Sequence, residues 1–75
     1  MNYAWFDFES TTLARAAYTD PLALLHLPFR SGAHYTYSEV PPEVFQNLMD
    51  APSKGTSFNR HIRDRYAFVK AAGEN

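Results

Sequence analysis

The sequence predicts a small α+β domain, in which a three-stranded antiparallel meander is followed by two C-terminal helices packed on one face of the sheet. Three observations support this prediction. Residues 12–39 contain short stretches of strand-forming residues that end at turn signals. Residues 40–70 carry apolar side chains at helical spacing. With 75 residues, the chain is long enough for one hydrophobic core and too short for two.

Three segments are expected to form the meander. Residues 12–18 are small or aromatic and precede a turn signal at Thr19-Asp20-Pro21. In residues 22–29, Leu25, Leu27 and Phe29 alternate with His26 and Pro28, and residues 33–39 alternate tyrosine with polar residues. A period of two is the pattern of a half-buried strand. We therefore place one strand in each segment.

The loop between the last two strands decides which face of the sheet Tyr35 and Tyr37 occupy. A three-residue loop, Arg30-Ser31-Gly32, puts Gly32 where a type I turn with a bulge requires a left-handed residue. That register pairs Tyr35 with Leu27 and Tyr37 with Leu25, so both tyrosines face the core. A two-residue loop would place both rings on the other face, free to stack on unpaired bases. We favour the first, because the second requires a positive φ at a serine.

The first helix is expected to begin at Val40-Pro41-Pro42, because proline suits the first helical turn. Residues 50–55 should break it, with Gly55 as a left-handed residue of a tight turn. A second helix is expected from Thr56 or Ser57 onward, and residues 71–75 are expected to fray. Its sheet-facing side chains would be Phe58, Ile62, Tyr66 and Val69.

Several classes of function are disfavoured by what the sequence contains. There is no cysteine, so disulfides and thiolate metal sites are excluded. His26 and His34 are expected to lie diagonally on one sheet face, but two histidines do not complete a zinc site, and we predict no metal and no cofactor. No set of nucleophile, base and orienting group is evident, so we predict that the protein is not an enzyme. The N-terminus has no basic region of a signal peptide and no apolar run spans a membrane, so we expect a cytoplasmic location.

The charges are unevenly distributed along the chain, although the net charge is only −1. Residues 1–52 carry two basic and six acidic side chains, whereas residues 53–70 carry five basic side chains and one acidic one. Such a charge run is most often a solvated helix face. The functional alternative is a weak, salt-sensitive surface for RNA phosphates. Its candidate residues are Lys54, Arg60, Arg63 and Lys70.

The turn Ser53-Lys54-Gly55 opens the second expected helix and suggests a phosphate site, because helix N-termini bind anions. It lacks the spacing of a nucleotide-binding loop. We favour a tight turn between two helices as the reason for these residues.

Two longer patterns are combined in this chain: Leu25-x-Leu27-x-Phe29-x-x-Gly32-x-x-Tyr35-x-Tyr37-x-x-Val40-Pro41, and Ala51-x-Ser53-x-Gly55-x-x-Phe58-Asn59-x-x-Ile62-Arg63. Together they resemble the KTSC domain, which is named after the C-terminus of certain lysyl-tRNA synthetases. The resemblance covers residues 10–70 and implies a bacterial protein with a suggested role in RNA binding. It assigns motif positions to Gly32, Tyr35, Tyr37, Val40, Pro41, Ser53, Gly55, Phe58 and Asn59.

Residues 1–9 lie outside the resemblance and form an aromatic N-terminal extension. They include Tyr3, Trp5, Phe6 and Phe8. The extension is expected to pack against the rest of the chain, either over the open face of the sheet or as an extra strand, because exposed aromatic residues lower solubility. The alternative is docking to a protein partner or a second copy of the chain.

Overall fold

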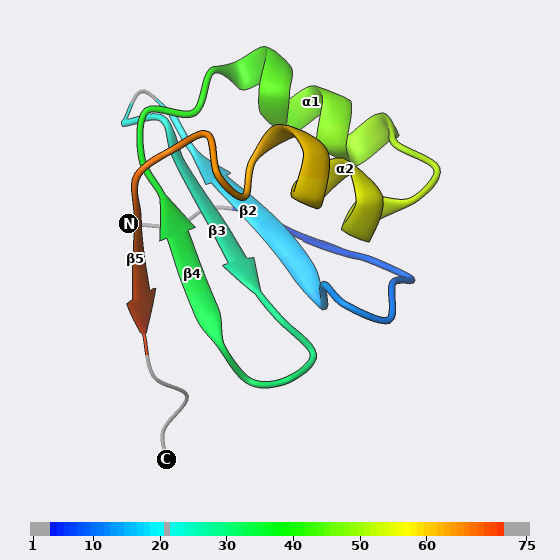
Figure 1. Cartoon of the computed structure of the whole chain (residues 1–75). Helices are drawn as coiled ribbons and strands as arrows, with labels where there is room; N and C mark the ends of the chain where they lie inside the picture. The colour runs from blue at the N-terminus through cyan, green and yellow to red at the C-terminus, as the bar shows by residue number, and fades with distance from the viewer. Residues whose placement is uncertain (1–3, 21, 72–75) are drawn as a thin grey trace.

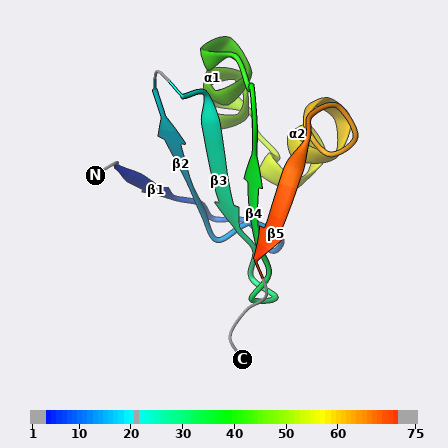
Figure 2. The ribbon, with the colours of Figure 1, turned by 90° about the vertical axis from the view of Figure 1, so that its left-hand side faces the viewer.

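The protein is described by a computed structural model that covers residues 4–20 and 22–71. A five-stranded antiparallel sheet has its strands in chain order, and two helices follow the fourth strand. The elements are β1 (Trp5–Asp7), β2 (Arg15–Thr19), β3 (Leu24–Pro28), β4 (His34–Tyr37), α1 (Pro42–Asp50), α2 (Lys54–His61) and β5 (Phe68–Ala71). Both helices cover the same face of the sheet (Figure 1) (Figure 2). The α+β class is confirmed, but the predicted three-stranded sheet lacks β1 and β5.

The predicted register of the β3–β4 hairpin is confirmed. Leu25 lies opposite Tyr37, and Leu27 lies opposite Tyr35. The loop between them closes with a φ of 101° at Gly32, the conformation that a glycine adopts without strain. Both tyrosines therefore lie on the face that α1 and α2 cover.

The first edge strand, β1, arises from the N-terminal aromatic extension. Its residues pair antiparallel with β2, so that Trp5 lies opposite Ala17 and Phe6 opposite Ala16. A three-stranded sheet would leave the outer N–H and C=O groups of β2 unpaired, and β1 satisfies them. The extra strand that the sequence left open as an alternative is thus the one observed.

The other edge strand, β5, replaces the end of the predicted second helix. That helix stops at His61, and the chain turns back, with the N–H of Arg65 donating to the carbonyl of Ile62. Residues 68–71 then pair with β4, so the helical placement of Val69 and Lys70 was wrong. Aromatic and β-branched residues such as Phe68 and Val69 favour strands, and the free edge of β4 provides hydrogen-bond partners for one side of β5.

The second helix also begins earlier than predicted, at Lys54. Ser53 caps it by accepting a hydrogen bond from the N–H of Thr56. Gly55 therefore lies in the first helical turn, and its φ is not positive. The prediction of a left-handed residue at Gly55 was wrong. Ser53 caps the N-terminus of α2, so the helix begins directly after it without a left-handed residue.

The core lies between the helix-covered face of the sheet and the two helices. Tyr37 has only 1% of its surface exposed, while Tyr35 is half-buried at the margin. The largest fully buried side chains are Leu13, Leu25, Leu27, Tyr37, Val40, Leu48 and Ile62. No helix in the described part of the chain is long and apolar enough to cross a membrane.

Candidate functional site

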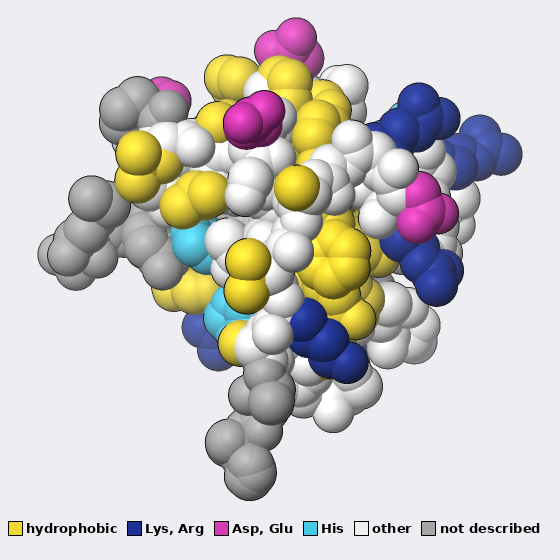
Figure 3. All heavy atoms as spheres, turned by 60° about the vertical axis from the view of Figure 1, so that its left-hand side comes forward, with side chains coloured by type: hydrophobic (Ala, Val, Ile, Leu, Met, Phe, Trp, Pro, Cys, Tyr) yellow, Lys and Arg dark blue, Asp and Glu magenta, His cyan; other side chains and the backbone are white. Residues whose placement is uncertain are grey.

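A groove of about 660 Å³ lies between α2, with the turn that follows it, and the neighbouring strands β4 and β5. We call it the α2–β5 groove. Five aromatic side chains line it: Phe29, Tyr35, Tyr37, Phe58 and Phe68. Figure 3 shows hydrophobic side chains (yellow) bordered by Lys and Arg side chains (dark blue) on one face of the molecule. The groove thus combines an aromatic surface with nearby positive charge.

The aromatic rings of the groove pack on one another in a fixed arrangement. Tyr35 and Tyr37 are stacked, with ring centroids 6.1 Å apart. Phe68 lies tilted against both, at 5.3 Å from Tyr35 and 5.4 Å from Tyr37. Phe58 meets Tyr37 edge to face and is only 4% exposed, whereas Phe68 is 49% exposed. Of these rings, Phe68 therefore offers a ligand the most surface.

Polar side chains join the aromatic residues in lining the groove. Lys70 projects from β5, and its Nζ lies 5.7 Å from the centroid of the Tyr35 ring. Arg63 comes from the turn after α2 and donates a long hydrogen bond of 3.5 Å to Oδ1 of Asn59. Asp64 adds one carboxylate beside them. The groove therefore has two cations, one amide and one anion within reach of a bound molecule.

The Tyr37 hydroxyl is held in its neutral form. Burial, followed by the neighbouring Tyr35, raises the pKa of Tyr37 to about 12, and Asp64 acts in the same direction. The positive charge of Arg63 opposes this shift. A tyrosine with the ordinary pKa of 10.0 is already uncharged at neutral pH, so this shift leaves the charges of the groove to Arg63, Asp64 and Lys70.

The structure brings together two of the four predicted phosphate-binding residues. Arg63 and Lys70 line the groove, while Arg60 is exposed on α2 and does not line it. The Nζ of Lys54 donates hydrogen bonds to the carbonyls of Met49 and Ala51, both at 2.7 Å. Lys54 thus holds the C-terminal end of α1.

Six lining residues of the groove were not among the predicted site residues: Thr12, Phe29, Ser31, Ala33, Asp64 and Phe68. Asp64 and Phe68 were missed because the second helix was expected to continue to Val69. The signal for Phe68 was its spacing of two from Lys70, which places both side chains on one face of a strand.

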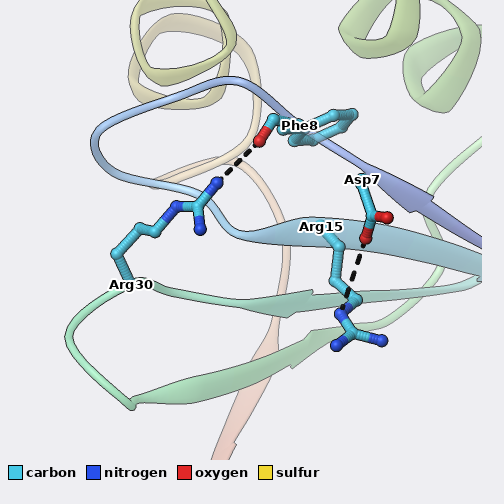
Figure 4. A network of polar contacts seen from close by, with 4 residues as sticks. All are labelled: Asp7, Phe8, Arg15 and Arg30. Atoms are coloured by element: carbon cyan, nitrogen blue, oxygen red, sulfur yellow. Dashed lines mark hydrogen bonds and ion pairs between the residues drawn. The ribbon is translucent and has the colours of Figure 1, made fainter.

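The described part of the N-terminal segment, residues 4–10, packs along the sheet and is held there by hydrogen bonds. Arg30 donates hydrogen bonds to the carbonyls of Phe8 and Ser10, at 2.7 Å and 3.0 Å. Figure 4 shows the Arg30–Phe8 bond and the Asp7–Arg15 ion pair of 4.0 Å. Phe8 joins the core, but Trp5 and Phe6 keep 37% and 42% of their surface exposed. Tyr3 lies outside the described residues.

His26 and His34 lie on the open face of the sheet, the face away from α1 and α2. The two ring nitrogens of His26 lie 2.9 Å from Oγ1 of Thr19 and 3.3 Å from Oγ1 of Thr36. The Trp5 ring packs against both histidines, at 6.4 Å and 6.3 Å between centroids. Within the described part of the chain, no group of three or more His, Asp and Glu side chains is arranged to hold a metal ion.

Comparison with known proteins assigns the chain to a family. The family model of the KTSC domain matches residues 9–66. The chain belongs to the KTSC domain family. A crystal structure of a KTSC domain protein from Yersinia pestis superimposes with a TM-score of 0.89 and 27% sequence identity, over 95% of this chain and all of that one. The five-stranded fold is thus shared with a solved KTSC domain.

Two sequence relatives show the settings in which such a domain occurs. A protein of Tsukamurella paurometabola is 41% identical over 61 residues, which is 81% of this chain and 91% of the relative. A lysine–tRNA ligase of Nostoc punctiforme is 37% identical over 60 residues, which is 80% of this chain. The match spans only 11% of the length of that ligase. A segment similar to this chain therefore makes up nearly all of one relative and a small part of the other.

Proposed function

We propose that this KTSC domain binds RNA in the α2–β5 groove and catalyses no reaction there. Arg63 and Lys70 would contact phosphates, and Arg60 would add positive charge from the exposed surface of α2. The proposal rests on one observation above all: a half-exposed aromatic ring, Phe68, lines the same groove as two cations. Aromatic surfaces flanked by basic side chains are typical of proteins that bind nucleic acid.

The relationship to a lysine–tRNA ligase supports RNA over other polyanions. The name of that relative identifies tRNA as a molecule it acts on, and a segment of it resembles most of this chain. The comparison gives no residue a role. Together with the geometry of the groove, it is a reason to test RNA before other polyanions.

The binding is expected to be weak and sensitive to salt. The domain has a net charge of −1, and Asp64 lies among the cations of the groove. Long-range attraction of RNA is therefore small, and local contacts with Arg63 and Lys70 must supply most of the electrostatic free energy.

The proposal is tested by NMR titration of the isotope-labelled domain with bulk tRNA, at low and at moderate salt. We expect shift changes in the amides of residues 58–70 and a marked loss of affinity at the higher salt concentration. Shift changes confined to other parts of the sheet, or an affinity that does not depend on salt, would contradict the phosphate contacts of Arg63 and Lys70.

A second function is favoured by a different surface, the open face of the sheet. Trp5 and Val69 both project on that face, and they are 37% and 69% exposed. Exposed apolar side chains of this kind mark protein-interaction surfaces. A protein partner or a second copy of the chain would cover them. Light scattering over a range of concentrations, with Trp5→Ser as the comparison, tests self-association, and a monomer at all concentrations excludes the second copy.

A further inference from the structure

The aromatic floor of the α2–β5 groove is recessed below its polar residues. Tyr37 and Phe58 line the groove, yet they are only 1% and 4% exposed. Phe68 is 49% exposed, and Lys70 lies beside it on the same face of β5. A ligand that fills this groove must bring a flat apolar surface inward and keep its charge at the margin.

We propose that the groove accommodates one unpaired base stacked on Phe68, and that the domain therefore selects single-stranded over duplex RNA. This inference rests on the proposed RNA-binding function and narrows it to a structural class of RNA. In this arrangement the base faces the aromatic floor, and the adjoining phosphates face Lys70 and Arg63.

The physical reason is that a duplex does not expose the faces of its bases. In a base-paired helix each base is stacked between its neighbours, and only base edges, sugars and phosphates reach a protein. Unpaired nucleotides in loops, bulges and single strands can turn a base outward onto an aromatic side chain. A duplex would reach Lys70 and Arg63 but not Phe68.

The packing of the other rings limits the groove to one base. Tyr35 is already in contact with Phe29, Tyr37 and Phe68, at centroid distances of 5.2, 6.1 and 5.3 Å. The ammonium group of Lys70 occupies part of the space over the Tyr35 ring. Phe68 is therefore the stacking surface that remains available among the aromatic residues of the groove.

The experiment compares two labelled RNAs by fluorescence anisotropy at one low salt concentration. One is an unstructured single strand of about eight nucleotides, near the site size of a small single-strand-binding domain. The other is a blunt-ended duplex without a loop, whose fully paired stem has the same nucleotide composition. The wild-type domain is expected to bind the single strand about tenfold more tightly than the stem.

Phe68→Ala is expected to lower affinity for the single strand about tenfold, with little effect on the stem. Val69→Ala is the matched control, because Val69 is the neighbouring residue of β5 and projects from the opposite face of the sheet. Phe68→Leu preserves apolar packing against Tyr35 and Tyr37 without an aromatic face. It should bind like Phe68→Ala while remaining folded.

The outcomes separate the two proposals. Equal affinities for single strand and stem, with no effect of Phe68→Leu, would overturn the stacking of an unpaired base. If that binding still weakened with salt, the proposed RNA-binding function would survive. No measurable binding of either RNA would overturn the proposed function, and the stacking proposal with it.

Discussion

Lys70 and Tyr35 lie directly opposite each other on paired strands, and the Lys70 ammonium sits 5.7 Å from the centroid of the Tyr35 ring. Strand pairing, and not a helix face, thus positions this cation on the aromatic groove. The attraction between an ammonium and an aromatic ring holds the side chain over the site before any ligand arrives. Pre-positioning of this kind reduces the conformational entropy that a phosphate contact would lose.

Replacing Lys70 with glutamine is expected to weaken RNA binding several-fold at low salt. The variant removes one phosphate contact, so the slope of log K against log salt should decrease in magnitude by about 0.7, the value for one charge on a single strand. Titrations at three or more salt concentrations measure both quantities.

Arg65→Gln is the matched control for this prediction. It removes the same charge from the domain, but Arg65 is exposed outside the groove. Its affinity and salt slope should stay close to those of the wild type. Equal losses in the two variants would show that net charge, and not the position of Lys70, determines binding.

Lys54 is predicted to stabilise the fold. Its Nζ donates to the carbonyls of Met49 and Ala51 at the C-terminal end of α1, and it lies 5.4 Å from the centroid of the Phe8 ring. Hydrogen bonds from a charged donor contribute more than neutral ones, so Lys54→Met should lower the free energy of unfolding by about 1–3 kcal/mol. Urea denaturation measures the change.

The comparison for Lys54 is Arg60→Met, a cation on the same helix whose side chain is exposed. Loss of an exposed charge usually changes stability by less than about 0.5 kcal/mol. If both variants were equally stable, the hydrogen bonds of Lys54 to the end of α1 would be of no consequence for the fold.

The sequence predicted the structure correctly where the conformation depends on a few neighbouring residues. The glycine at position 32 and the alternation around Tyr35 determined the hairpin register, and Pro41-Pro42 determined the start of α1. In each case the local conformation favours one residue type: a positive φ favours glycine, and the first helical turn accepts proline. These positions include the tyrosines that line the groove.

The two edge strands could not be predicted in the same way, because their formation depends on contacts distant in sequence. Residues 68–71 can form a helix or a strand locally, and pairing with the free edge of β4 determined that a strand formed. Two lining residues of the groove, Phe68 and Lys70, lie on this strand. The sequence therefore predicted which cations are candidates for binding phosphate, but it did not predict that two of them line the same groove as the Phe68 ring.

Gly55→Ala is expected to stabilise the domain by about 0.5–1 kcal/mol, because alanine has a higher helix propensity than glycine. The added Cβ would lie 3.4 Å from Oγ1 and 3.6 Å from Cβ of Thr12, which are ordinary contacts. Gly32→Ala is the contrasting variant. Its φ of 101° is strained for alanine, so the same substitution should destabilise the domain there. Thermal unfolding measures both effects, and midpoint temperatures that changed in the same direction in the two variants would contradict this prediction.

Stability should decrease below neutral pH because of His26. Burial, and then the nearby His34, lower the pKa of His26 from its usual value of 6.5. The unfolded chain therefore binds the proton more readily than the folded one, and protonation favours unfolding. The contribution of His26 is complete above about pH 6.5 and declines as the pH falls through that value toward the lower pKa of the folded state.

Urea denaturation at about pH 7.5 and about pH 5.5 checks this prediction, with His26→Gln as the comparison. An amide can still hydrogen-bond to Thr19 and Thr36, which flank His26 on the open face, but it does not titrate. The variant should lose less stability on acidification than the wild type. The same loss in both proteins would assign the acid sensitivity to other groups, since the hydrogen bonds of position 26 would be present in each.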